Sequence, residues 1–586
     1  MEKNNNTDIF KNLTWILKSI WKIDKKYILI SIITTGIGGI VSPVSLIVMQ
    51  KIINSIQVGE GSKSIFLYIG IYVGIDLLQT LYNNIVGFYN LKFSMKFEVK
   101  FSENIFKKAS KLSLSDYENS ATYDLINRAQ HEGGGKLLSY YSNFMNIIMQ
   151  IITLMSYMVI LFRFKIWIVI IVLIMPIIRY IINNKFNLKW FKIIRGRTND
   201  SRKSWYVSYL LTYGNFYKEL KTFNLFDYFI GKYKSYIVKF NKEDLKLSKA
   251  QSIIYSVLSL FETIIDGLLF TYTVMLGVSG SILIGNVITY TRTIMSSKSS
   301  ITSILLNISS TINESLFIDQ LFEYFNLEEE DNIGKIIINS IEDIKLTNLS
   351  YKYPNSKDYV LKNINLEITK NKKIALIGMN GSGKTTLIKL IMGFYSDYEG
   401  TILINGIELR QIDKESLILQ ISTLFQDFVK YEATIRENIG YSNFNIIDKD
   451  GEIYEIAKKF NLNSIIKQKD RKLDTQLGTW FDDGVNLSMG QWQKIALSRA
   501  FAKDSSLYIL DEPNAAMDSI TEYEISKLYE ELLKDRMGII IAHKFSNIIK
   551  VVDEIVVISD GNIAEKGKHD ELMKKEGLYR RLYELK

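Results

Sequence analysis

The sequence predicts a multidomain chain that joins an all-α half with six membrane-spanning helices to an α/β half. Three observations predict this fold class. Apolar stretches that approach the roughly 20 residues of a spanning helix crowd the first half. Runs of Lys and Arg lie between these stretches. After an acidic patch at 328–332 (EEEDN), short β-rich runs alternate with helical patterns, as they do in α/β domains.

The composition of the 586 residues excludes several functional classes. They are 47% hydrophobic and carry a net charge of +10. The basic residues are segregated from the apolar ones, which indicates a lipid bilayer as partner and no nucleic acid. The absence of cysteine excludes disulfides, thiolate metal sites and cysteine nucleophiles. The polar start (MEKNNNTDIFKN) has no signal-peptide pattern, and the abundance of Ile, Lys and Asn is typical of an AT-rich bacterial genome.

Residues 1–26 are expected to form a cytoplasmic amphipathic helix. Within 8–24, Trp15, Leu17, Ile20 and Trp21 lie near helical spacing with lysines between them. This pattern is typical of a helix that lies on the membrane surface. The alternative is a simple extension of the first spanning helix.

Six spans are predicted within a transmembrane domain at 27–310. They lie near 27–51, 64–88, 138–161, 166–184, 251–276 and 282–306. The long connections at 89–137 and 185–250 are basic and keep a helical period, so we expect the spanning helices to continue through them into the cytoplasm. Together these features predict a multi-pass plasma-membrane protein whose amino terminus and carboxyl half are cytoplasmic. A linker is expected at 311–340 and a nucleotide-binding domain at 341–586.

The strongest chemical signal is a phosphate-binding loop at 372–390 (KKIALIGMNGSGKTTLIKL). An apolar strand leads into a glycine-rich turn, and a helix follows. Backbone N–H groups of such a loop surround phosphates, and the helix N-terminus adds partial positive charge. Lys384 should contact the β- and γ-phosphates of ATP, and the Thr385 hydroxyl should bind Mg²⁺. The expected ATP-binding residues here are Gly378, Asn380, Gly381, Ser382, Gly383, Lys384, Thr385 and Thr386.

A second apolar run at 506–510 ends in two acids, Asp511 and Glu512. We expect Asp511 to hold the magnesium ion and Glu512 to orient or deprotonate the attacking water. An apolar run that ends in acids is by itself a weak indication of an ATP site. It becomes a strong one because the same chain carries a phosphate-binding loop earlier in its sequence.

A third motif, LSMGQ at 487–491, precedes a helical pattern (QWQKIALSRAFAK). With it the chain resembles the ATP-binding-cassette superfamily, whose signature is usually written LSGGQ. Met489 departs from that signature at the first glycine. The resemblance implies a P-loop ATPase domain with a helical subdomain. In this family Ser488 and Gly490 contact the γ-phosphate of the ATP that the partner subunit's phosphate-binding loop holds, and Gln491 is a further expected ATP-binding residue.

Further positions match the same family in order. Tyr353 resembles the aromatic residue that stacks on adenine, and Gln426 resembles the glutamine that contacts Mg²⁺. Asp518 falls in the loop that crosses the dimer interface. His543 resembles the switch histidine at the γ-phosphate and completes, with Glu512, the expected catalytic pair.

One chain holds one phosphate-binding loop and one signature, so the resemblance implies a dimer, with a homodimer preferred and a heterodimer possible. Six spans before the cassette resemble the exporter branch and make this a half-transporter. Short helices near 112–123 and 210–224 fall where exporters place the helices that dock on the cassettes. Asp482, Asp483 and Gly484 occupy the segment that contacts those helices.

The GQWQK and WFDDG segments resemble exporters of lanthionine-containing peptides (lantibiotics) and related bacteriocins. A lipid or multidrug exporter shares the other motifs, and a non-transport cassette ATPase fits the carboxyl half. Asp76, Glu262 and Asp266 are placed at mid-membrane depth, where acids are costly and often functional. They are expected to line a cavity that favours a cationic amphiphilic peptide; the alternative is internal pairing with Arg292 or with backbone groups.

Overall fold

The computed structural model describes residues 9–330, 334–354, 356–467, 471–511, 519–542 and 551–584. The chain divides into two compact units. The helical unit comprises Met1–Ser110 and Ala121–Leu327. The α/β unit comprises Glu328–Lys586 together with a short segment from the first half, Lys111–Ser120.

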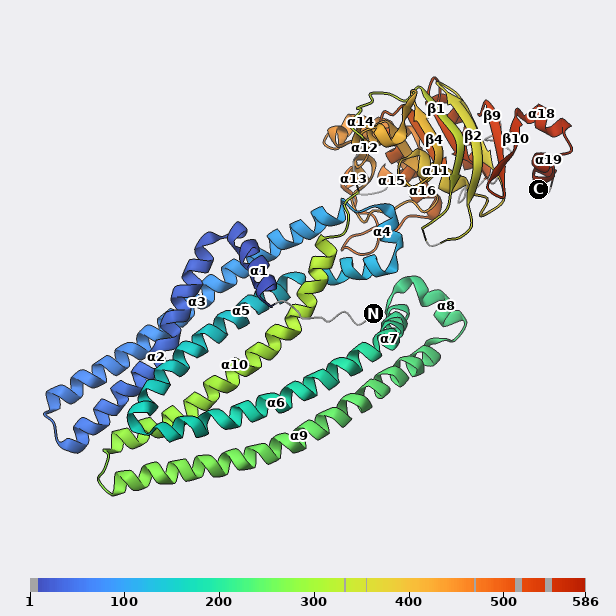
Figure 1. Cartoon of the computed structure of the whole chain (residues 1–586). Coiled ribbons are helices and arrows are strands. Elements are labelled where there is room, and N and C mark those ends of the chain that lie inside the picture. The colour runs from blue at the N-terminus through green and yellow to red at the C-terminus, as the bar shows by residue number, and fades with distance from the viewer. Residues whose placement is uncertain are drawn as a thin grey trace. The chain divides into compact units, whose positions relative to one another are not determined.

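The helical unit consists of long helices that run up and down (Figure 1). Its elements are α1 (Ile9–Ile23), α2 (Lys25–Val58), α3 (Ser62–Ala109), α5 (Ser120–Phe164), α6 (Ile166–Gly196), α7 (Thr198–Thr212), η1 (Gly214–Phe216), α8 (Tyr217–Thr222), α9 (Phe226–Val278) and α10 (Ile284–Phe325). Among the described residues, six helices are long and apolar enough to cross a membrane: α2, α3, α5, α6, α9 and α10. Each predicted span falls on one of them.

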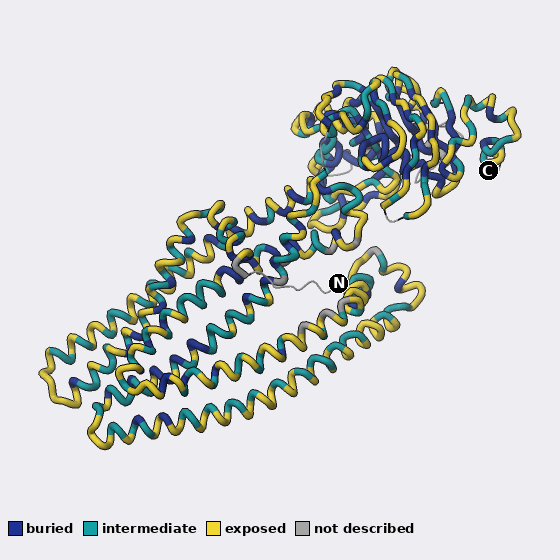
Figure 2. The backbone as a smooth tube through the Cα atoms, in the orientation of Figure 1, coloured by how far each residue is buried: buried dark blue, intermediate teal, exposed yellow. Residues whose placement is uncertain are grey.

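The outward surface of this unit is apolar. Figure 2 shows the long helices mainly in the colours of exposed and intermediate residues, whereas buried residues concentrate in the α/β unit. Large side chains such as Phe66, Leu78 and Phe88 on α3 are more than two-thirds exposed. A water-soluble protein would bury such a surface, so these side chains are suited to contact lipid.

The helices extend well beyond the thickness of a bilayer. α3 has 48 residues and α9 has 53, which corresponds to lengths of about 70–80 Å at 1.5 Å per residue. The expectation that the long connections continue the spanning helices is confirmed. α10 continues to Phe325, so the first part of the range assigned to a linker, 311–325, is the end of that helix.

The predicted amino-terminal helix forms as α1, but its apolar stripe has a protein partner. Ile16 and Ile20 are fully buried, and Trp15 packs on Phe322 of α10 with ring centroids 4.8 Å apart. Asn12 on the same face donates hydrogen bonds to the Ser315 hydroxyl (2.6 Å) and to Asp319 (3.1 Å). Helix α1 therefore packs against α10, and the stripe that we expected to face the bilayer is largely covered.

The α/β unit contains two sheets. An antiparallel sheet has the order β2-β1-β4-β5, from β1 (Asp343–Tyr351), β2 (Leu361–Thr369), β4 (Glu399–Ile404) and β5 (Ile407–Glu408). The second sheet has the order β10-β9-β3-β8-β7-β6, from β3 (Lys373–Ile377), β6 (Ile421–Leu424), β7 (Leu507–Asp511), β8 (Met537–Ile541), β9 (Glu554–Ser559) and β10 (Asn562–Gly567). All its neighbours pair in parallel except β10 with β9. Strands β7 and β8 are buried along their whole length, as parallel strands covered on both faces require.

Helices surround these sheets. They are α4 (Leu114–Glu118), α11 (Lys384–Ile391), η2 (Leu409–Gln411), α12 (Lys414–Leu419), α13 (Ile435–Gly440), η3 (Phe444–Ile446), α14 (Asp450–Lys459), α15 (Asn463–Lys467), η4 (Lys472–Asp474), α16 (Met489–Ala502), α17 (Ser519–Leu532), α18 (His569–Lys574) and α19 (Leu578–Glu584). Elements α13 to α16 build the helical subdomain, whose side chains share a core with strands β7 and β8.

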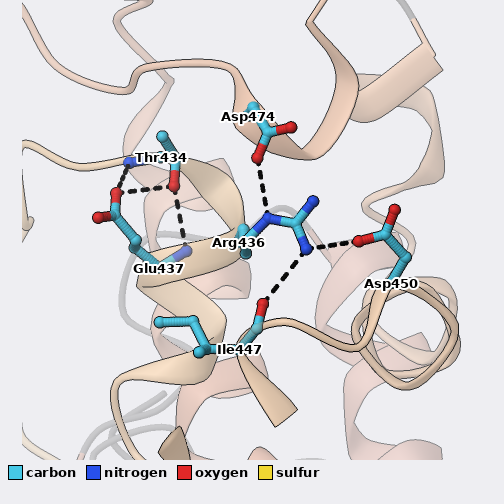
Figure 3. Close-up of polar contacts among 6 residues, drawn as sticks. All are labelled: Thr434, Arg436, Glu437, Ile447, Asp450 and Asp474. Carbon is cyan, nitrogen blue, oxygen red and sulfur yellow. Dashed lines mark hydrogen bonds and ion pairs between the residues drawn. The ribbon is translucent and has the colours of Figure 1, made fainter.

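An arginine holds three elements of the helical subdomain together (Figure 3). Arg436 on α13 donates to Asp474 in η4 (2.8 Å) and to the carbonyl oxygen of Ile447 (3.2 Å), and it pairs with Asp450 at the start of α14. Carboxylate contacts raise the pKa of Arg436, so its charge is kept at every relevant pH. The Arg436 side chain thus connects α13, η4 and α14, all of which are short elements.

Candidate functional site

The predicted phosphate-binding loop has the required strand–loop–helix context. It connects β3 to α11, and Gly383 is the N-cap of that helix with φ of 105°. A Cβ atom at Gly383 would lie 2.7 Å from the Leu361 side chain, and one at Gly378 would lie 2.2 Å from the carbonyl oxygen of Ile558. Only glycine lets the backbone turn this tightly against its neighbours.

Lys384 occupies the centre of this loop. Its side chain is buried, and Nζ donates to the carbonyl oxygens of Gly378 and Met379 at 2.9 Å each. A buried ammonium must be compensated by hydrogen-bond acceptors, and the loop carbonyls supply them. The charge is therefore held at the N-terminus of α11, where an anionic phosphate gains most from it.

Thr385 and Asp511 come together although 126 residues separate them in the chain. The Thr385 hydroxyl lies 3.4 Å from Oδ2 of Asp511, which is buried at the end of β7. Hydroxyl and carboxylate oxygens are donors that Mg²⁺ prefers. Within the described residues, no group of three or more His, Asp or Glu side chains could hold a metal by itself.

Tyr353 lies in an aromatic cluster beside the loop. Its hydroxyl is 3.0 Å from that of Thr386, and its ring meets the edges of Tyr351 and Tyr395 at centroid distances of 5.3 and 5.8 Å. Burial, followed by a hydrogen bond to Glu118, raises the pKa of Tyr395. Tyr351 and Tyr395 were not predicted, because one tyrosine among 35 carries no signal in the sequence.

The short helix expected within 112–123 is present as α4, and it packs within the α/β unit. Its Glu118 accepts hydrogen bonds from the Tyr395 hydroxyl (3.0 Å) and from Lys389 (3.1 Å) on α11. A second ion pair joins Lys111 to Glu329 at 3.0 Å. One carboxylate thus connects α4 both to the aromatic cluster and to the helix that begins at Lys384.

The signature motif begins a helix, in keeping with the helical pattern that follows it in the sequence. Ser488 is the N-cap of α16, where its hydroxyl accepts from the Gln491 N–H (3.3 Å) and the Gln491 side chain accepts from the Ser488 N–H (2.9 Å). This is a reciprocal capping box. Ser488 and Met489 are exposed and Gly490 is half-buried, so this helix end is accessible.

Gln426 is exposed and lies just after β6, and the segment after it is bound to the signature helix α16. Arg499 on α16 donates to the carbonyl oxygens of Asn438 (2.9 Å) and Val429 (3.1 Å). Its guanidinium also stacks on Tyr431 at 4.5 Å. Burial lowers the pKa of Arg499. Arg499 could not be predicted as part of the site, because nothing in the sequence pairs it with residues 429–438.

Three expected site residues, Glu512, Asp518 and His543, lie outside the described residues. The segment before the signature is described. Asp483 pairs with Arg471 at 3.0 Å, and Gly484 makes a close turn against Gly478. Trp480 and Phe481, which precede it, are 75% and 57% exposed.

The three membrane acids do not gather. Glu262 pairs with Arg179 at 3.2 Å, Asp266 pairs with Lys298, and Asp76 is exposed on α3. Glu262 and Asp266 therefore form ion pairs within the helical unit, as the alternative expected, but neither pairs with Arg292. The Arg292 guanidinium lies beside the Met49 sulfur instead, at 3.5 Å.

The chain is similar to known proteins over its whole length. A family model described as ABC transporter matches residues 361–515. The subtilin transport ATP-binding protein of Bacillus subtilis is 35% identical over 98% of this chain and 94% of its own length. The nisin transport ATP-binding protein of Lactococcus lactis subsp. lactis is 34% identical over 97% of this chain and 95% of its own length. A solved structure described as a bacterial Atm1-family ABC exporter with ATP bound has a TM-score of 0.76 at 20% identity and covers 99% of both chains, which confirms the predicted fold class.

Proposed function

The chain belongs to the ATP-binding-cassette transporter family, and from this premise we propose that it exports an amphiphilic, lantibiotic-like peptide across the plasma membrane. It is a multi-pass membrane protein that binds nucleotide and couples ATP hydrolysis to transport. The observation that carries the ATP chemistry is the buried Lys384 held at the N-terminus of α11. The proposed boundaries remain 1–26, 27–310, 311–340 and 341–586, with α10 continuing into the third range.

ATP is proposed to bind with its phosphates in the loop at 378–386. Lys384 Nζ then gives up its hydrogen bonds to the carbonyl oxygens of Gly378 and Met379 and bonds to phosphate oxygens. The Tyr353 hydroxyl gives up its contact with the Thr386 hydroxyl, and the Tyr353 ring stacks on adenine. Glu512 accepts the proton of the attacking water, and His543 contacts the γ-phosphate.

Mg²⁺ is the proposed metal, because the oxygens of Thr385 and Asp511 are donors of the kind that it prefers. Gln426 is the third proposed ligand. The ion would neutralise negative charge on the phosphates when bound. Thr385 and Asp511 act by fixing its place relative to the loop.

A second subunit is proposed to complete each site, and we favour a homodimer. The N-terminus of α16 follows the exposed Ser488, and Gly490 and Gln491 are half-buried beside it, so this helix end can meet a phosphate held by the other copy. Asp518 lies in the loop proposed to cross the interface. The α/β unit is proposed to face the cytoplasm of a bacterial cell, in keeping with the basic connections next to it.

The peptide cargo is supported by two relatives that are named for the transport of subtilin and of nisin, and by the GQWQK and WFDDG segments. ATP binding is proposed to close the cassettes and to open the membrane helices outward, and hydrolysis to reset them. Helix α4 transmits this change, since Glu118 contacts α11 directly.

The test is ATP-dependent uptake of a fluorescent lanthionine peptide into inside-out proteoliposomes that contain the full chain. We expect uptake with ATP and Mg²⁺ and none with a non-hydrolysable analogue. Uptake of fluorescent lipids or hydrophobic drugs without peptide uptake would contradict the cargo and favour a lipid or multidrug exporter.

The matched variant in this assay is Glu512→Gln. It should bind ATP normally but hydrolyse it about 10²–10⁴ times more slowly, which is the range that a positioned general base contributes. Retention of labelled ATP on the purified protein separates binding from hydrolysis. Hydrolysis at the wild-type rate would show that Glu512 is not the catalytic carboxylate.

A further inference from the structure

The helical unit contains a cavity of about 510 Å³ among α2, α3, α5 and α10, and its wall is polar but uncharged. Seventeen of its twenty-one lining residues carry a hydroxyl or a carboxamide group, and none carries a formal charge. The remaining four are Gly38, Val86, Met145 and Met149. The membrane acids Asp76, Glu262 and Asp266 are not among the residues that line it.

The lining residues form continuous stripes on their helices. On α3 they run from Gln79 to Asn90 at helical spacing, and on α5 from Tyr141 to Tyr157. At 1.5 Å per residue, the α5 stripe is about 24 Å long. An extended peptide of about seven residues has the same length. The cavity is thus elongated, and the polar residues that line it repeat along one whole face of each helix.

Five carboxamide side chains line this cavity: Gln79, Asn83, Asn90, Asn146 and Gln150. None of them makes a hydrogen bond to another described residue, whereas cavity hydroxyls such as Thr153 bond to the backbone of their own helix. Each carboxamide has two donors and one oxygen that accepts twice. A polar group left without a partner at membrane depth is costly, so water or a ligand must satisfy these groups.

We propose that this cavity binds the cargo peptide through its backbone amides; the inference rests on the proposed peptide export and names how the peptide is recognised. Carboxamides and peptide groups carry the same donors and acceptors, so they pair without regard to the peptide's side chains. Met145 and Met149 are flexible and adapt to different side chains. Lipid tails and hydrophobic drugs offer no partners to these groups. Selection by cargo charge, which the membrane acids suggested, has no counterpart in this wall.

The experiment measures binding without ATP to the full chain in lipid nanodiscs. The probe is a short peptide of alternating Gly and Ser with blocked termini and an uncharged BODIPY label. It is compared with its backbone N-methylated analogue, which lacks the amide donors. We expect the unmodified peptide to bind at least about tenfold tighter, equivalent to about 1.4 kcal/mol. Equal affinities for the two probes in the wild-type protein would overturn the proposal, and this comparison needs no variant.

The double variant Asn83→Leu, Gln150→Leu should lose most of this preference. Asn84→Leu is the matched control: Asn84 is the next residue on α3 but does not line the cavity, and this variant should keep the tenfold preference. A preference unchanged in the double variant would overturn the proposal. So would a lysine-containing peptide that binds much tighter in a salt-sensitive way, because charge would then govern recognition.

Peptide export and backbone recognition can fail separately. ATP-driven uptake of a lanthionine peptide together with no discrimination between the two probes would leave the proposed function intact and remove only this inference. Absence of uptake for every peptide would remove the proposed function. Binding of a sugar-headed lipid in place of both probes would overturn the inference and would point to a lipid cargo.

Discussion

At the scale of single residues, the ATP site shows how much local chemistry a motif implies. Gly383 has φ of 105°, and its missing side chain leaves room for Leu361. The motif predicts a glycine here for the backbone conformation, but the neighbour that enforces it comes from β2, more than twenty residues earlier. The close contact adds a second reason for glycine that only the folded chain reveals.

We predict that Gly383→Ala lowers ATP affinity more than tenfold. The loop backbone would hold the alanine in the left-handed conformation that Gly383 already has, which costs about 1–2 kcal/mol, and the added Cβ costs about 1–3 kcal/mol by overpacking against Leu361. Binding of a fluorescent ATP analogue to the detergent-solubilised protein measures it. Gly406→Ala is the control, because Gly406 also has positive φ (75°) but nothing within 4 Å of the added Cβ. If both variants bind ATP equally well, the contact with Leu361 has no role.

At the scale of elements, short helices depend on side chains that tie them to neighbours. Helix α13 has six residues and η4 has three, too few to be stable alone. Arg436 joins both to the start of α14, and Arg499 joins α16 to the segment after Gln426. The segment that follows Gln426 and the signature helix α16 are thereby held together.

We predict that Arg436→Ala loosens this subdomain by about 1–2 kcal/mol. Its two carboxylate partners are more than half exposed, so the loss is smaller than for a buried pair. Hydrogen–deuterium exchange in α13 and the start of α14 should become about tenfold faster. Arg580→Ala, which removes an exposed i,i+4 pair with Glu584, should change exchange by less than about twofold. Unchanged protection in Arg436→Ala would show that the apolar core alone holds these helices.

Helix α4 has five residues and depends on similar ties. We predict that Glu118→Ala lowers the ratio of peptide-stimulated to basal ATP hydrolysis toward one, because it removes the contacts of α4 with Tyr395 and Lys389. Phosphate release in lipid nanodiscs measures the ratio. Glu342→Ala, which breaks an exposed ion pair with Lys370 elsewhere in the α/β unit, is the control and should keep the wild-type ratio. A normal ratio in Glu118→Ala would mean that coupling uses other contacts.

At the scale of the whole molecule, the question is whether two copies share each ATP. Lys384→Ala and Ser488→Ala should each abolish hydrolysis. Co-expressed, they should restore about one quarter of the wild-type rate, because half of random pairs are mixed and each mixed pair keeps one intact site. Colorimetric phosphate release on the co-purified dimers measures this. No recovery, or full activity of an isolated single copy, would contradict a site shared between subunits.

The sequence alone determined the fold class, the helical continuations and the ATP-site motifs, because bilayer thickness and phosphate chemistry impose local patterns that a single stretch of chain must carry. It also predicted Thr385 and Asp511, each from its own motif, as Mg²⁺ ligands. Only the tertiary structure brought them within 3.4 Å, gave Glu118 its contacts and gathered uncharged side chains of four helices around one cavity. Such groupings depend on which helix faces meet, and that is decided by packing between segments far apart in the chain.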